Sequence, residues 1–351
     1  MTDFQATFRR QFPNALFLDS NHHDGLDDLL KARGWIRDDE VIRHLEKPGE
    51  GNMNFVVRVV TDQRAMILKQ SRPWVQKYPQ VAAPAERVVT EARFYEVVQS
   101  VADLETAMPG LLGFDEENLL IALEDLGPNS DFTVLYRRSV MPDLAALRSL
   151  VRFLSELHNA DFGAARAHFP DNQALKGVNH QHIFEFPYRE ESGFDLDTVQ
   201  PGLQALAMNF KRDEALKSRV RELGDVYLGT GPCLLHGDFY PGSWLNTADG
   251  AKVIDPEFAY FGRPEYDVAV LVAHLRMARL STDQIGELLR AYEAPSGFDA
   301  ALCAGFSGAE VLRRLIGLAQ LPVDLSLEEK QALLAGAREA VLQPAAAAWF
   351  A

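Results

Sequence analysis

Apolar residues follow two different patterns along the 351-residue chain. In its first third, short apolar runs indicate β-strands, and they cover residues 55–60, 65–70 and 119–126. After residue 144, apolar positions recur at helical spacing, as in residues 144–158, where they form one amphipathic face. The pattern therefore predicts strands followed by helices.

Further elements follow from the same periodicity. We expect additional helices over residues 26–33, 85–98 and 203–226. Asp24 is the expected N-cap of the first of them. Loops are predicted for residues 161–200, for His22 and His23, and the alanine-rich residues 345–348 are expected in a terminal helix.

Residues 71–84 interrupt the pattern with three prolines, which predicts an irregular loop. Long loops beside a ligand site often act as lids. Trp74 in this loop either shields such a site or packs on the protein surface, and the sequence leaves both options open.

Two acidic motifs follow β-like runs in the last third of the chain. His236-Gly237-Asp238 comes after one run, and Asp255-Pro256-Glu257 after the next. On an extended backbone the spacing i, i+2 puts Asp255 and Glu257 on one face, and paired carboxylates suit Mg²⁺. Asp238 could orient and deprotonate a hydroxyl group. These are the parts that phosphoryl transfer needs; two unrelated acidic turns are the alternative.

The first third supplies candidates for binding a nucleotide. Gly51, Asn52 and Asn54 lie in a turn between strand-like runs, where small residues let the backbone approach phosphate. Lys69 ends the next predicted strand, and Glu91 lies in the following helix. Kinase folds hold a phosphate-binding lysine with a helix carboxylate in this order. A plain hairpin and a solvated edge-strand lysine are the alternatives.

The two acidic motifs resemble the catalytic core of the aminoglycoside phosphotransferase and choline kinase superfamily. The Asp-Pro-Glu form, with Gly242-Ser243 after the catalytic loop, most resembles its methylthioribose kinase branch. The resemblance covers about residues 49–322. It implies an α+β, bilobal protein-kinase-like fold. The N-lobe, residues 1–126, would hold an antiparallel sheet, one main helix and the nucleotide; the mostly helical C-lobe, residues 127–351, would be catalytic and bind the substrate.

The resemblance also implies roles for single residues. Ser243 stands where many members carry an asparagine metal ligand, and Glu124 and Leu126 fall in the hinge whose backbone binds adenine. Asp267 would brace the catalytic loop, with a simple N-cap as the alternative. Arg313 and Arg314, in a helix over residues 309–319, would reach the sugar and the transferred phosphate. Adjacent helical residues point about 100° apart, so we expect one arginine to face the cleft.

One departure from that branch concerns the acceptor. Phe239, Tyr240 and Pro241 replace its usual Leu-His-Thr, and we expect this aromatic pair to reshape the acceptor pocket. A methylthioribose-like sugar is the first choice of substrate, and an aminoglycoside, an amino alcohol or a different sugar is the second. A nucleotide-binding pseudokinase sensor is a further alternative. Retention of the lysine and the acidic residues argues against it.

Charge and composition limit the partners. The net charge of −15 argues against nucleic acid or an anionic membrane as a partner, and no apolar run reaches the roughly 18 residues of a membrane span. Cys233 and Cys303 form no motif, for which a reducing cytoplasm is the simplest explanation. We expect ATP, Mg²⁺ and a small-molecule hydroxyl substrate, with a homodimer as a possible assembly.

Overall fold

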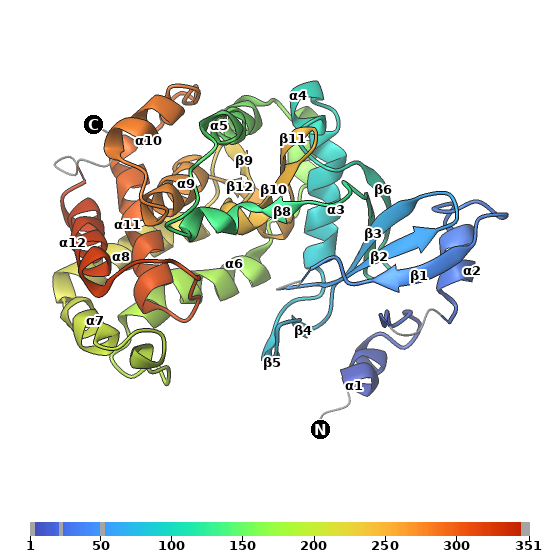
Figure 1. Cartoon of the computed structure of the whole chain (residues 1–351), viewed down its shortest axis with the longest axis horizontal. Coiled ribbons are helices and arrows are strands. Elements are labelled where there is room, and N and C mark those ends of the chain that lie inside the picture. The colour runs from blue at the N-terminus through green and yellow to red at the C-terminus, as the bar shows by residue number, and fades with distance from the viewer. Residues whose placement is uncertain (1–3, 21–23, 50–52, 345–351) are drawn as a thin grey trace.

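The computed structural model describes residues 4–20, 24–49 and 53–344. Figure 1 shows a sheet and helix α3 at one end of the molecule and a bundle of helices at the other. The predicted order of strands followed by helices is therefore confirmed. Gly51, Asn52 and the predicted terminal helix over residues 345–348 lie outside the described residues, as do His22 and His23. The predicted boundary between residues 126 and 127 stays a prediction.

Within the described residues, the larger sheet has five antiparallel strands in the order β1-β2-β3-β7-β6. They are β1 (Ile42–Glu46), β2 (Phe55–Thr61), β3 (Ala65–Gln70), β6 (Leu111–Asp115) and β7 (Leu120–Glu124). Side chains of a strand alternate between its faces. Both faces of this sheet are apolar, so each needs a covering layer.

Helix α3 (Arg87–Val98) covers one face of the sheet, and the N-terminal segment covers the other. Phe94 of α3 shares a core with Ile121 of β7, whereas the neighbouring Leu120 packs with Trp35 from the N-terminal segment. The covering part of that segment includes α2 (Leu26–Ala32), whereas Phe8 of α1 (Phe4–Gln11) belongs to the core that contains α3. Helix α4 (Ala102–Glu105) follows α3. The predicted N-cap Asp24 is wrong, because Gly25 takes the N-cap position of α2 in a left-handed conformation.

The predicted irregular loop over residues 71–84 is also wrong in part. It contains a short hairpin, β4 (Trp74–Val75) and β5 (Tyr78–Ala82). Pro79 is tolerated there because a strand of an isolated hairpin has one side without a hydrogen-bonded neighbour. Trp74 is buried and its ring lies 5.3 Å from that of Phe4. The packing alternative for Trp74 therefore holds.

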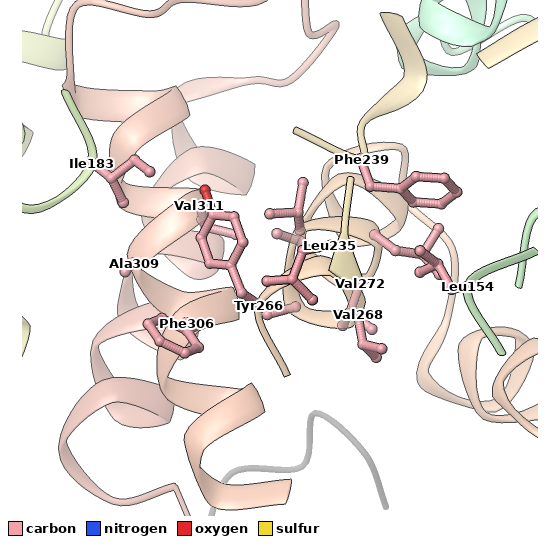
Figure 2. Packing of buried hydrophobic residues seen from close by; sticks show 14 of the residues in the cluster. Leu154, Ile183, Leu235, Phe239, Tyr266, Val268, Val272, Phe306, Ala309 and Val311 are labelled. Carbon is pink, nitrogen blue, oxygen red and sulfur yellow. The ribbon is translucent and has the colours of Figure 1, made fainter. Parts of the chain in front are cut away.

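The rest of the described chain is mainly helical around one apolar core (Figure 2). Its longer helices are α5 (Leu144–Asn159), α6 (Gln173–His180), α7 (Leu203–Lys211), α8 (Glu214–Leu228), α9 (Glu265–Met277), α10 (Thr282–Leu289), α11 (Ala300–Ile316) and α12 (Leu327–Leu342). Helix α6 lies in the region predicted to be rich in loops. Across the described ranges, no helix combines the length and apolar character that crossing a membrane requires.

The single helix predicted over residues 203–226 is in fact two. Asp213 separates α7 from α8, and its side chain accepts the backbone N–H of Leu216 as an N-cap. An aspartate that can bond the backbone in this way favours a new helix start over a helix interior.

Short elements complete the C-lobe. Strand β8 (Ser130–Asp131) pairs with β10 (Trp244–Thr247), which pairs with β11 (Gly250–Val253). Strand β9 (Cys233–Leu235) pairs with β12 (Tyr260–Gly262). The short helical turns are η1 (Phe132–Tyr136), η2 (Gly163–His168), η3 (Gln181–Glu185), η4 (Phe186–Tyr188), η5 (Leu196–Thr198), η6 (Pro241–Ser243) and η7 (Pro256–Phe258).

The packing of the N-terminal segment on the sheet can be tested at Gly113 of β6. A Cβ at this position would lie 1.9 Å from Nε1 of Trp35. We expect Gly113→Ala to lower the free energy of unfolding by about 1–3 kcal/mol, as overpacking does. Gly286→Ala in α10 is the control, because nothing lies within 4 Å of its Cβ. Equal unfolding midpoints for both variants in urea would contradict this packing.

Candidate active site

The loop that carries Asp238 connects β9 to η6 and has a tightly constrained backbone. Gly237 has φ +83°, and a Cβ there would come 2.2 Å from the carbonyl oxygen of Phe258. Glycine is therefore required at this position, both by the backbone conformation and by the close approach.

Asp267 braces this loop from within α9. Its carboxylate accepts the backbone N–H of His236 at 2.7 Å and of Gly237 at 3.0 Å. His158 approaches the same carboxylate, with 3.3 Å between Nε2 and Oδ2. The alternative of an N-cap is wrong, because α9 begins two residues earlier and its N-cap is Pro264.

Both arginines predicted for the acceptor side face Asp238. Arg314 Nη2 lies 3.4 Å and Arg313 Nη1 3.8 Å from Oδ1 of Asp238. The expectation that only one of them faces the cleft is therefore wrong. The reason is Glu310, one turn earlier in α11. It pairs with Arg313 at 3.1 Å and with Arg314 at 2.6 Å, which draws both long side chains to the same side.

Glu310 was not among the residues that the sequence singled out, although its i, i+3 and i, i+4 spacing to the arginines was a signal. Its carboxylate is also 3.1 Å from Nε2 of His274, whose Nδ1 lies 2.6 Å from the Tyr136 hydroxyl. Burial alone would raise the pKa of Glu310, but Arg313 and Arg314 hold it well below its usual range. Glu310 therefore stays ionised and fixes both arginines through its two ion pairs.

Opposing effects also set the pKa of Asp238. Burial raises the pKa of its carboxyl group, while Arg314 and Arg313 oppose that rise. The group is thus less acidic than an exposed aspartate. A carboxylate of raised pKa is the better acceptor of a hydroxyl proton.

The two aromatic residues after Asp238 have different surroundings. Phe239 is fully buried and stacks on Phe153 with ring centroids 5.8 Å apart, among the core side chains of Figure 2. Tyr240 lies under the guanidinium group of Arg314, 4.9 Å from the ring centroid. The predicted aromatic pair beside the acceptor is therefore wrong for Phe239, which serves the core, and Tyr240 remains beside the arginines.

On the opposite side of the site, Lys69 joins α3 to the second acidic motif. Its ammonium group donates to Glu91 at 2.7 Å and also to Asp255. Both Lys69 and Glu91 are buried. Burial would lower the pKa of Lys69, but Asp255 and Glu91 raise it well above its ordinary value. The lysine therefore carries its charge throughout the neutral pH range.

The extended backbone expected for the Asp255-Pro256-Glu257 motif is wrong. Asp255 has φ +63°, in the left-handed region, and Glu257 lies in the short helical turn η7. The two carboxylates consequently have different environments. The side chain of Asp255 is 43% exposed. That of Glu257 is buried, 3.0 Å from Nε of Arg87 and 3.1 Å from the amide nitrogen of Asn54.

The remaining predicted residues occupy supporting positions. The hydroxyl of Ser243 donates to the backbone oxygen of Asp238 at 3.0 Å and so closes the catalytic loop. Glu124 ends β7, and its carboxylate accepts the backbone N–H of Gly110 at 3.0 Å. Leu126 follows in the half-buried connection to the C-lobe.

The residues around Lys69 are compatible with a magnesium ion. Three carboxyl groups, from Glu91, Asp255 and Glu257, lie against Lys69 and Arg87, and Asp255 is the exposed one of the three. Among the residues that the structure describes, no group of three or more His, Cys, Asp or Glu could hold a metal ion by itself. Mg²⁺ is often held by one or two carboxylates with substrate phosphates completing its shell, and the exposed Asp255 fits that arrangement.

Comparison with known proteins gives consistent matches. A profile of the phosphotransferase enzyme family matches residues 44–306. A methylthioribose kinase of Exiguobacterium sibiricum is 27% identical over 330 residues, which cover 78% of this chain and 79% of that protein.

Solved structures support the fold. A choline/ethanolamine kinase family protein from Mesorhizobium loti has a TM-score of 0.52 at 17% identity, covering 93% of this chain and 97% of that one. The AMP-bound spectinomycin phosphotransferase has a TM-score of 0.53 at 12% identity, covering 91% and 98%. The predicted bilobal protein-kinase-like α+β fold is confirmed by these likenesses.

The buried network behind the arginines predicts a pH effect on stability. Burial lowers the pKa of His274 to about 4, whereas an unfolded histidine titrates near 6.5. As the pH falls below about 6.5, the unfolded state binds the proton first, so stability is lost between about pH 6.5 and 4. This group contributes a slope of up to about 1.4 kcal/mol per pH unit.

Urea unfolding between pH 4 and 8 measures this slope. We expect His274→Gln to unfold with a shallower pH dependence than the wild type over that interval. His168→Gln is the control, because His168 is exposed in η2. Identical slopes for the wild type and His274→Gln would refute the assignment of this proton to His274.

Proposed function

The chain belongs to the phosphotransferase enzyme family and is an ATP-dependent small-molecule kinase, and from this premise we propose that its acceptor is an uncharged sugar similar to methylthioribose. The transferred group is the γ-phosphoryl of ATP, and the acceptor atom is a hydroxyl oxygen. The methylthioribose kinase from Exiguobacterium sibiricum supports this choice through its similarity over 79% of its length.

The observation that carries the proposal is the arginine pair on Asp238. Two guanidinium groups lie within 4 Å of the carboxylate that would meet the acceptor. Glu310 is already paired with both of them. The two guanidinium groups therefore face two carboxylates, and the charges of the four side chains balance. A cationic acceptor would find no unpaired carboxylate in this cluster, whereas a neutral sugar hydroxyl can accept hydrogen bonds from the arginines.

On the acceptor side, the reaction needs groups that orient the hydroxyl, accept its proton and stabilise developing negative charge. Asp238 would orient the attacking hydroxyl and accept its proton. Arg313 and Arg314 would offset the negative charge that develops on the transferred group, which is the kind of stabilisation that fixed charges provide best. Because Glu310 holds both arginines in place, they need little reorganisation during the reaction.

On the nucleotide side, Lys69, held by Glu91, would bind the phosphates. The turn with Gly51, Asn52 and Asn54 would lie over them, and the backbone at Glu124 and Leu126 would bind adenine. The AMP-bound spectinomycin phosphotransferase, which shares the fold, supports the use of a nucleotide by this architecture.

For magnesium, the exposed carboxylate of Asp255 is the proposed ligand. When bound, the metal would neutralise phosphate charge and polarise the transferred group. Glu257 and Ser243 are the other candidates from the sequence. Their present partners, Arg87 and the Asp238 carbonyl, compete with that role.

The acceptor is tested by ADP release with methylthioribose, ribose, choline and an aminoglycoside. We expect methylthioribose or a related neutral sugar to give the highest kcat/KM, because the arginines offer hydrogen-bond donors to a hydroxyl and their paired carboxylates leave no net charge to attract a cation. Robust turnover of choline or the aminoglycoside alone would overturn the sugar proposal and leave the kinase assignment intact.

Asp238→Asn tests the catalytic loop. The amide cannot accept the hydroxyl proton, so we expect kcat to fall by about 100-fold or more, with the KM for ATP nearly unchanged. The control is Asp249→Asn, in the exposed turn between β10 and β11. Turnover within about threefold of wild type would refute the role of Asp238.

A further inference from the structure

Arg87, at the first position of α3, is a buried arginine that the proposed reaction does not use. It is 1% exposed. Its guanidinium group donates to five oxygens: the carbonyls of Met53 (2.9 Å), Arg72 (2.9 Å), Trp74 (3.5 Å) and Pro84 (2.7 Å), and Oδ1 of Asn54 (3.0 Å). Its Nε is also 3.0 Å from Oε2 of Glu257.

These acceptors belong to separate parts of the site. Met53 and Asn54 belong to the predicted phosphate turn. Arg72 and Trp74 connect the strand of Lys69 to the β4–β5 hairpin. One side chain thus fixes both N-lobe segments that flank the nucleotide side.

The charge of Arg87 requires the contact with Glu257. The other five acceptors are neutral, and an unpaired cation in the interior costs several kcal/mol. The amide of Asn54, 3.1 Å away, donates to the same oxygen of Glu257. The described side-chain contacts of Glu257 therefore both engage Oε2 and both come from the N-lobe.

Helix α3 approaches the second acidic motif at two points. Arg87 and Glu91 are four residues apart, which places them on one face of the helix. Arg87 holds Glu257 directly, and Glu91 holds Asp255 through the ammonium group of Lys69. The two contacts together fix both carboxylates of the motif relative to α3.

We propose that Arg87 is a positioning residue for the phosphoryl transfer, and that Glu257 acts as its lobe-bridging partner rather than as a magnesium ligand. The bridge sets the phosphate turn and Lys69 at the right distance from Asp255 before the nucleotide binds. The proposal rests on the use of ATP and is independent of which acceptor is phosphorylated.

The test compares ATP binding with and without metal. Calorimetric titration of ATP is run in excess Mg²⁺ and again in excess EDTA, on Glu257→Gln, Arg87→Lys and the double variant. Asp255→Asn is the reference for loss of a metal ligand. The matched control is Glu40→Gln, because Glu40 is an equally buried N-lobe carboxylate, paired with Arg64 and Thr61.

We expect Glu257→Gln and Arg87→Lys each to weaken ATP binding about tenfold, by the same factor in Mg²⁺ and in EDTA. The double variant should bind ATP with about the same affinity as the more affected single variant, because both substitutions break the same interaction. Glu40→Gln should lower the melting temperature without changing ATP affinity. The KM for the acceptor should stay within about twofold in all of them.

Three results would overturn the proposal. Loss of affinity in Glu257→Gln only when Mg²⁺ is present, as in Asp255→Asn, would make Glu257 a metal ligand. Reduced melting temperatures with unchanged ATP affinity would make the bridge merely structural. Fully additive losses in the double variant would show that the two residues act separately. Because Arg87→Lys keeps the charge, it remains informative if Glu257→Gln does not fold.

Discussion

The site depends on one constraint, which is that each buried charge must have a partner of opposite sign. An unpaired ion in a protein interior costs several kcal/mol, so the pairing determines the geometry. Lys69 lies between Glu91 and Asp255, and Arg87 against Glu257. Removal of Glu257 would leave Arg87, and removal of Lys69 would leave Glu91, buried without its ion-pair partner, and for that reason these contacts hold the lobes together in one arrangement.

A second set of charges on the acceptor side follows the same rule and is joined to the first through the backbone. Glu310 fixes the two arginines that face Asp238. Nε2 of His236, two residues before Asp238, donates a hydrogen bond at 2.9 Å to the carbonyl oxygen of Ile254, the residue directly before Asp255. The catalytic loop and the second acidic motif are therefore positioned together, so the proposed base and the proposed metal ligand share one frame.

The sequence predicted what depends on local pattern. Strand runs, amphipathic helices and the two acidic motifs are visible in neighbouring residues, and the family resemblance followed from them. Prediction from the sequence failed where contacts between distant residues determine the local structure. The extended backbone expected at Asp255 was wrong because a left-handed turn sends Glu257 to Arg87, 170 positions earlier in the chain. No sequence pattern near Arg87 indicates its role, because its acceptors include backbone carbonyls of separate segments.

The arginine pair shows how a local rule can mislead when applied to Cα directions alone. Adjacent helical residues diverge by about 100°, yet long side chains can converge on a shared partner. Glu310 provides that partner one turn away, and Tyr240 limits the space of Arg314 from the other side. Both guanidinium groups are thus fixed before a substrate arrives, and little side-chain entropy remains to be lost on binding. Because the carboxylates of Asp238 and Glu310 balance their charges, the rigid arginine pair offers hydrogen-bond donors to a neutral hydroxyl and no net charge to attract a cation.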